Sequence, residues 1–140
     1  QLPTSISGIQ PEFKLSNGDW NSSLEILSST IENLFEYESY EASQVQILIP
    51  HSRYLDEVEQ AKYKENKKIG GIGSINIESI YKFKGLESEV VVLIAPNLES
   101  LKSENTSDIK SLMYVGMSRA TTYLIVIGNQ EVKQLMNWDQ

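Results

Sequence analysis

The residues best suited to chemistry form two short elements, Ser79-Ile-Tyr-Lys-Phe-Lys-Gly-Leu-Glu87 and Leu112-Met-Tyr-Val-Gly-Met-Ser-Arg-Ala120. The second element contains Arg119, and the only other arginine in the chain is Arg53. A guanidinium group is planar, permanently charged and suited to bidentate contact with phosphate, which lysine side chains cannot reproduce. Arg119 is therefore a candidate for sensing a phosphate group. The alternative is an arginine that complements a helix dipole or forms a salt bridge.

The first element has the composition of a loop that binds nucleic acid. Lys82 and Lys84, with nearby main-chain amides, are suited to a phosphate backbone, and Tyr81 or Phe83 to stacking on a base. Glu87 is suited to accept a hydrogen bond from a sugar hydroxyl. The alternative is an ordinary connection between two strands, with solvated lysines and a buried Phe83.

The glycines near these elements indicate special backbone positions. Gly85 permits a positive φ or a close approach of the backbone to a ligand. Gly116 lies in a predicted helix, where it costs about 1 kcal/mol relative to alanine, so it indicates close packing or close ligand approach. The stretch Gly70-Gly-Ile-Gly-Ser74 is interpreted as a plain turn, because a Walker A loop follows a strand and these glycines precede one.

Composition restricts the class of protein. The chain has 140 residues, which is the size of one domain, and it has no cysteine and a single histidine, His51. The absence of cysteine excludes a disulfide scaffold and a thiolate metal site, and it leads us to expect a reducing cytoplasmic location. The single histidine argues against a Ser-His-Asp triad. No segment is apolar enough to cross a membrane. The start at Gln1 without methionine suggests a fragment of a larger protein.

The net charge of −7 argues against a free-standing DNA-binding domain, which usually has a basic face. Any contact with nucleic acid must therefore be local or shared with another part of a larger protein. His51 is interpreted as a loop histidine. Arg53 follows a predicted strand and is a further candidate for phosphate contact.

Strands are predicted at 11–15, 45–49, 75–80, 90–95 and 123–127. Helices are predicted from a capping box formed by Ser22 and Glu25 to about residue 37, over 52–66, from about 108 to 120, and from 129 to 138. The runs 90–95 and 123–127 are continuously apolar, which is typical of strands covered on both faces. This alternation predicts a three-layer α/β domain with a mostly parallel sheet. Both elements follow a predicted strand, so both are expected at the carboxyl edge of the sheet.

The two elements together resemble the last two motifs of UvrD/Rep-like superfamily 1 DNA helicases. That family has a Thr-Ile-His-x-x-Lys-Gly-Leu-Glu element and then a Tyr-Val-(Ala/Gly)-x-(Thr/Ser)-Arg-Ala element, each next to a buried strand. This chain has Ser79-Ile-Tyr-Lys-Phe-Lys-Gly-Leu-Glu87 and Tyr114-Val-Gly-Met-Ser-Arg-Ala120 in the same order. Tyr81 stands where the family commonly has histidine, and Ser79 where it commonly has threonine.

The resemblance implies a C-terminal RecA-like domain covering residues 1–140, cut from an ATP-dependent DNA helicase or translocase. By position, Arg119 would reach the γ-phosphate of ATP, and Glu87 with Gly85 would approach the nucleotide. The implied contacts with single-stranded DNA come from one loop: Ser79, Tyr81, Lys82 and Lys84.

The resemblance also implies partners and a cofactor. ATP with Mg²⁺ would be bound mainly by an N-terminal RecA-like domain of the same polypeptide, because the chain has no Walker A lysine and no Walker B acidic pair. The 140 residues alone are therefore expected to be monomeric and unable to hydrolyse ATP. Two alternatives remain at this point: an inactive RecA-like interaction module, and an unrelated nucleotide-binding or flavodoxin-like α/β domain.

Overall fold

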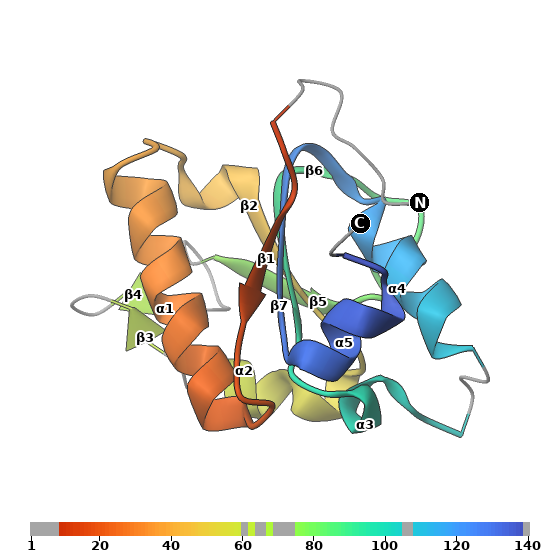
Figure 1. Cartoon of the computed structure of the whole chain (residues 1–140). Helices are drawn as coiled ribbons and strands as arrows, with labels where there is room; N and C mark the ends of the chain where they lie inside the picture. The colour runs from red at the N-terminus through yellow and green to blue at the C-terminus, as the bar shows by residue number, and fades with distance from the viewer. Residues whose placement is uncertain (1–8, 60–61, 64–66, 69–74, 105–107, 139–140) are drawn as a thin grey trace.

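A five-stranded sheet forms the centre of the computed structural model, which describes residues 9–59, 62–63, 67–68, 75–104 and 108–138 (Figure 1). Its strands, in spatial order, are β1 (Glu12–Leu15), β7 (Ala120–Gly128), β6 (Ser88–Ala95), β2 (Val45–Ile49) and β5 (Asn76–Ser79). Each pair of neighbouring strands in this sheet runs parallel. The predicted α/β class with a mostly parallel sheet is confirmed.

Helices cover both faces of the sheet, as Figure 1 shows. One face packs against α1 (Trp20–Glu36) and α2 (Leu55–Glu59), and the other against α3 (Leu98–Leu101), α4 (Ile109–Met117) and α5 (Gln130–Leu135). Two short 3-10 helices, η1 (Ala42–Gln44) and η2 (Ser52–Tyr54), flank β2. A separate antiparallel pair, β3 (Lys62–Tyr63) and β4 (Lys67–Lys68), lies between α2 and β5 in the sequence.

The apolar runs are buried on both faces because successive strand side chains point in opposite directions. In β6, Val90, Val92 and Ile94 pack on the side of α1, whereas the alternate residues pack on the side of α4 and α5. Val90–Ala95 is fully buried. The continuous apolar pattern thus predicted the layered arrangement correctly.

The first helix begins earlier than the capping box predicted. Asp19 is the N-cap of α1, and its Oδ1 accepts a hydrogen bond from the Ser22 main-chain N–H at 2.7 Å. Asp19 thus satisfies one of the main-chain N–H groups that have no partner within the helix. Ser22 carries that N–H, so it lies inside the first turn and is not the cap. Asn97 caps α3 in the same way, accepting from the Ser100 N–H at 2.8 Å, in a segment for which no helix was predicted.

The helix predicted over 52–66 is wrong beyond its first turns. After η2, α2 ends at Glu59, and β3 and β4 follow. The apolar stripe of this segment consists of Leu55 and Val58, which is too little buried surface to hold a long helix against the sheet. The glycine-rich stretch 70–74 lies outside the described residues.

Gly128 is required by close packing at the carboxyl end of β7. A Cβ atom there would lie 2.7 Å from the Ala95 carbonyl oxygen and 3.2 Å from the Phe13 ring. Because backbone must move to admit the methyl group, Gly128→Ala is expected to lower the free energy of unfolding by about 1–3 kcal/mol. Urea denaturation measures the change, with Ser29→Ala on the exposed side of α1 as a control expected to stay within about 0.5 kcal/mol. Equal stability of the two variants would contradict this packing.

A phenol–carboxylate hydrogen bond joins β1 to the start of β7. The Tyr123 hydroxyl donates to Glu12, and burial together with this bond raises the pKa of Tyr123. Tyr123→Phe is expected to cost about 1 kcal/mol near neutral pH. Above about pH 10 the unfolded tyrosine ionises while the folded one stays protonated, so wild type loses stability that the variant does not. Urea denaturation should show that the difference in free energy of unfolding between wild type and Tyr123→Phe is smaller near pH 11 than at pH 7. The same difference at both pH values would contradict the raised pKa of Tyr123.

Candidate functional site

The connection between β5 and β6, residues 80–87, runs along the strand direction. It starts at the carboxyl ends of the parallel strands, which we call the carboxyl edge, and finishes at their amino ends, which we call the amino edge. Ser79 ends β5 and pairs with Ile49 at the end of β2, whereas Ser88 begins β6 beside Ala120. Parallel strands rise about 3.3 Å per residue, so the two ends of the connection lie roughly 20 Å apart along the strand direction. We call this segment the crossover. The predicted loop therefore has one end at each edge.

The crossover is a series of tight turns anchored by one aromatic side chain. The Phe83 N–H donates to the Ser79 carbonyl at 3.1 Å, and the Leu86 N–H donates to the Phe83 carbonyl at 3.0 Å. Phe83 is only 8% exposed and packs in the core below α4. It is therefore not available to stack on a base. Gly85 has φ +88°, and a Cβ there would meet no atom within 4 Å, so conformation rather than packing requires glycine.

A pocket of about 430 Å³ lies at the carboxyl edge, where β2 and β5 end. We call it the carboxyl-edge pocket; it is lined by Pro50, His51, Ser52, Arg53, Ser79, Tyr81, Lys82, Ser103 and Leu112. Three of the four residues predicted to contact DNA are in this lining. Tyr81 is 77% exposed, and Lys82 is also exposed. Lys84 is exposed on the same turn but is not part of the lining.

Arg119 lies at the opposite, amino edge, so the prediction that both elements share the carboxyl edge is wrong. The helix ends at Met117, three residues before its predicted end, and Ser118 is its C-cap. Arg119 then lies in the turn that precedes β7. The physical reason is that α4 starts after β6 has ended and returns the chain to the amino edge, where the next parallel strand must begin.

The structure brings Arg119 together with the far end of the crossover. The Ser88 N–H donates to the Arg119 carbonyl at 3.0 Å, and Arg119 Nη1 donates to the Leu86 carbonyl at 3.4 Å. Arg119 Nη2 donates to the Ser118 hydroxyl at 3.0 Å. Glu87, which is exposed, lies between Leu86 and Ser88 in the sequence. Of the three residues predicted to face the nucleotide, Glu87 and Arg119 thus lie at the same edge, and Gly85 lies two residues before Glu87 in the crossover.

The guanidinium of Arg119 has unused capacity for an anion. Its Nε is buried and has no hydrogen-bond partner among the described residues. Within the same residues, no ion pair joins Arg119 to a carboxylate. Nη1 and Nη2 each have a second N–H donor, and these donors with the unneutralised charge fit a phosphate group. The roles predicted for Arg119, Glu87 and the DNA-facing residues stay predictions.

Gly116 permits close packing between α4 and the sheet. A Cβ atom at this position would lie 3.1 Å from Ile80 Cδ1 and 3.3 Å from Leu93 Cδ2. Of the two interpretations of this glycine, close packing is therefore the one observed. Leu112, on the same helix, lines the carboxyl-edge pocket, and Arg119 follows the other end of the helix. α4 therefore spans the same two edges as the crossover.

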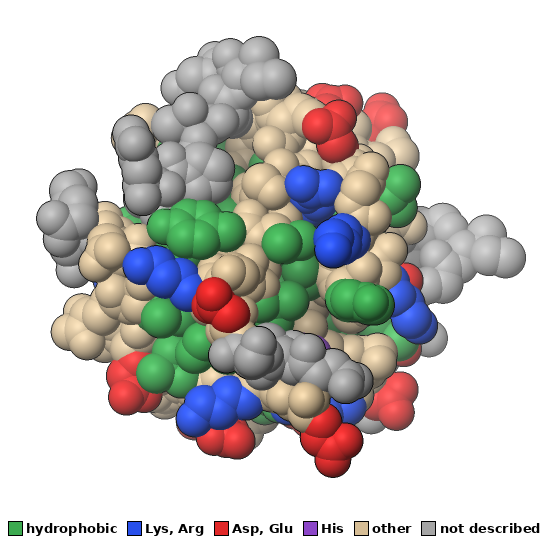
Figure 2. Space-filling view, turned by 90° about the vertical axis from the view of Figure 1, so that its right-hand side faces the viewer, with side chains coloured by type: hydrophobic (Ala, Val, Ile, Leu, Met, Phe, Trp, Pro, Cys, Tyr) green, Lys and Arg blue, Asp and Glu red, His purple; other side chains and the backbone are tan. Residues whose placement is uncertain are grey.

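On the side of α4 and α5, positive charge is scattered rather than gathered in one large patch. Figure 2 shows the side of α4 and α5, where lysine and arginine side chains lie among hydrophobic ones and most acidic side chains lie toward the rim.

In the described part of the chain, no group of three or more His, Cys, Asp and Glu side chains could hold a metal ion. No helix in that part is long and apolar enough to span a membrane.

Comparison with known proteins identifies the class and then the family. The structure is similar to a crystal structure of the C-terminal domain of a possible DNA helicase from Lactobacillus plantarum WCFS1. The TM-score is 0.69 at 14% sequence identity, over 90% of this chain and 78% of that chain, which shows a common RecA-like fold. The model of the UvrD-like helicase C-terminal domain family matches residues 15–131. The chain belongs to this family.

Family membership confirms the resemblance drawn from the two elements and excludes an unrelated α/β domain. A comparison with curated proteins returned no match. Sequence reasoning assigned no binding role to His51 and no definite one to Arg53, which line the pocket with the predicted residues. The available signal was their position directly after a strand that was correctly predicted.

Proposed function

We propose that the chain is the second motor domain of an ATP-dependent DNA helicase or translocase. It would work with a separate N-terminal RecA-like domain of the same polypeptide, which binds most of the ATP and Mg²⁺. One observation carries the proposal: the crossover has Ser79, Tyr81 and Lys82 at the carboxyl-edge pocket and Glu87 beside Arg119 roughly 20 Å away. A single short segment is then in reach of both a DNA strand and a nucleotide.

At the amino edge, Arg119 acts as an arginine finger. ATP with Mg²⁺ supplies the phosphoryl-transfer chemistry, and Arg119 stabilises the negative charge that develops on the transferred group. The absence of an ion pair to Arg119 among the described residues, and the second N–H donors of its Nη1 and Nη2, support this role. Glu87 accepts a hydrogen bond from a sugar hydroxyl, and Gly85, with φ +88°, gives the crossover the turn that precedes Glu87.

At the carboxyl edge, the domain contacts single-stranded DNA. Tyr81 offers an exposed ring for stacking on a base, and Lys82 and Lys84 offer charges for the phosphate backbone. The Ser79 hydroxyl accepts from the Lys82 N–H at 3.3 Å and so shapes the turn that presents both side chains. Because these contacts are few and local, the net charge of −7 does not oppose DNA binding.

The test is ATP hydrolysis by the full-length protein with and without single-stranded DNA. We expect turnover that rises when a thymidine oligonucleotide is added, and no turnover from the 140 residues alone. If the full-length protein binds ATP but hydrolyses none with or without DNA, the domain is an inactive interaction module and the proposal fails.

A further inference from the structure

We propose that Ser88 is a positioning residue that holds Arg119 where it can act on the transferred phosphoryl group. Ser88 is the first residue of β6 and directly follows Glu87, and it belongs to neither of the two elements that carry the predicted site. This inference rests on the proposed function and deepens it, because it concerns the same amino-edge site. Ser88 acts through Arg119 and does not itself touch the nucleotide.

The main chain of Ser88 holds the main chain of Arg119. The Ser88 N–H donates to the Arg119 carbonyl at 3.0 Å, and Ser88 pairs with Ala120, the first residue of β7. Arg119 lies in the turn between α4 and β7, so this bond fixes the turn on the side of the sheet. The main chain of Arg119 sets the direction in which its guanidinium points. That direction therefore depends on how firmly Ser88 is held.

Two side-chain hydrogen bonds hold Ser88. Its hydroxyl donates to the Gln44 carbonyl at 3.1 Å, and its own carbonyl accepts from the Thr121 hydroxyl at 3.4 Å. Gln44 ends η1 and is itself fixed, since its side chain accepts a hydrogen bond from the Glu41 N–H at 2.8 Å. Ser88 thus ties the turn that contains Arg119 to η1 and to β7.

A bulge in β7 begins at the same place. From the pair Ser88–Ala120 to the next pair, β6 advances two residues and β7 advances three. A bulge disrupts the regular pairing of two strands and changes the direction of nearby side chains, and bulges are frequent beside active sites. Regular pairing alone therefore does not fix the chain next to Arg119. The hydroxyl of Ser88 supplies a further restraint at this point.

A small displacement of Arg119 is expected to affect hydrolysis more than ATP binding. The guanidinium acts on charge that appears mainly in the transition state, and a misplacement of about 1 Å can be costly for such a group. In the proposed function, ATP is bound mainly by the N-terminal domain, so the affinity for ATP does not depend on Ser88. Loss of the Ser88 hydroxyl should therefore lower kcat and leave the Kd for ATP unchanged.

The test compares Ser88→Ala with Ser88→Thr in the full-length protein, by ATP hydrolysis at a saturating concentration of a thymidine oligonucleotide. Ser88→Ala removes the hydroxyl and is expected to lower kcat about three- to tenfold, with the Kd for a fluorescent ATP analogue unchanged. Ser88→Thr keeps a hydroxyl and should recover most of the rate. Ser100→Ala is the matched control, because the Ser100 hydroxyl also donates to a main-chain carbonyl, that of Asn97 at 2.6 Å, but at α3. This control should keep the wild-type kcat.

A double-mutant cycle separates positioning of Arg119 from a general loss of stability. If Ser88 acts through Arg119, Ser88→Ala should not slow hydrolysis further in an Arg119→Ala background, which single-turnover measurements can follow. The same loss in both backgrounds would refute the positioning role. A wild-type kcat in Ser88→Ala, while Arg119→Ala is slow, would refute it too, and the proposed function would stand. A full-length wild-type protein that binds ATP but hydrolyses none would overturn the proposed function and this inference with it.

Discussion

Arg119→Ala is expected to reduce DNA-stimulated ATP hydrolysis by the full-length protein about 10³-fold while ATP binding survives. The loss is large because a guanidinium finger acts on charge that appears mainly in the transition state. Arg119 is suited to this role, since no carboxylate in the described residues neutralises it and its Nη1 and Nη2 each have a second N–H donor. Steady-state hydrolysis gives kcat, and a fluorescent ATP analogue gives the binding constant separately.

Two further variants make the result specific to the guanidinium group. Arg119→Lys keeps the charge but not the planar fork, so we expect it to recover only a small part of the lost rate. Lys14→Gln removes one positive charge from β1, the edge strand beyond β7, and should leave turnover unchanged. The hydrogen bond from the Ser88 N–H ends on the Arg119 main chain and persists in each variant. Wild-type turnover in Arg119→Ala would refute the finger.

Much of the fold could be predicted because the strands carry their own signal. Val90–Ala95 and Tyr123–Ile127 are apolar on both faces, which in a chain of alternating strands and helices requires a covered parallel sheet. The polar ends of these strands carry no such signal. Ser88 and Ala120 extend the pairing of β6 with β7 by pairing with each other. Because these residues are 32 positions apart in the sequence, local periodicity cannot predict their contact.

The edge at which Arg119 lies could not be predicted by the rule that was applied. The rule placed each element after its preceding strand, but a helix as long as α4 carries the chain back to where parallel strands begin. The same difficulty affects the crossover, which looks like one loop in the sequence and joins two distant edges in the structure. His51 was interpreted as a loop histidine and Arg53 as a further candidate for phosphate contact, but their contacts with the Leu101 and Lys102 carbonyls could not be predicted, because no helix was predicted where α3 lies.

Tyr81→Ala is expected to weaken binding of single-stranded DNA by about 1–3 kcal/mol, which is about 5- to 150-fold in Kd. Stacking requires an exposed aromatic face at the place where the strand lies. Tyr81 is 77% exposed and lines the carboxyl-edge pocket, whereas Phe83, two residues later, is 8% exposed. Fluorescence anisotropy with a labelled thymidine oligonucleotide, on the full-length protein without nucleotide, measures the change.

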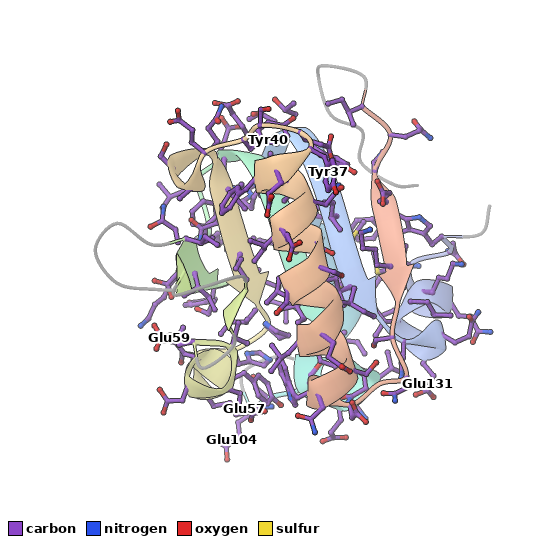
Figure 3. All side chains as sticks on the ribbon, turned by 90° about the vertical axis from the view of Figure 1, so that its left-hand side faces the viewer. Tyr37, Tyr40, Glu57, Glu59, Glu104 and Glu131 are labelled. Atoms are coloured by element: carbon purple, nitrogen blue, oxygen red, sulfur yellow. The ribbon has the colours of Figure 1, made fainter. Side chains whose placement is uncertain are left out.

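The chain provides a matched control for this substitution. Tyr37 is 82% exposed and lies at the C-terminal end of α1, away from the end of the molecule where α2 lies (Figure 3). Tyr37→Ala removes the same side chain and should leave the Kd for DNA unchanged. Tyr81→Phe keeps the ring and should bind nearly as well as wild type, because stacking needs the face and not the hydroxyl. Equal losses in Tyr37→Ala and Tyr81→Ala would mean that exposed tyrosines act nonspecifically, and a wild-type Kd in Tyr81→Ala would remove Tyr81 from the DNA contact.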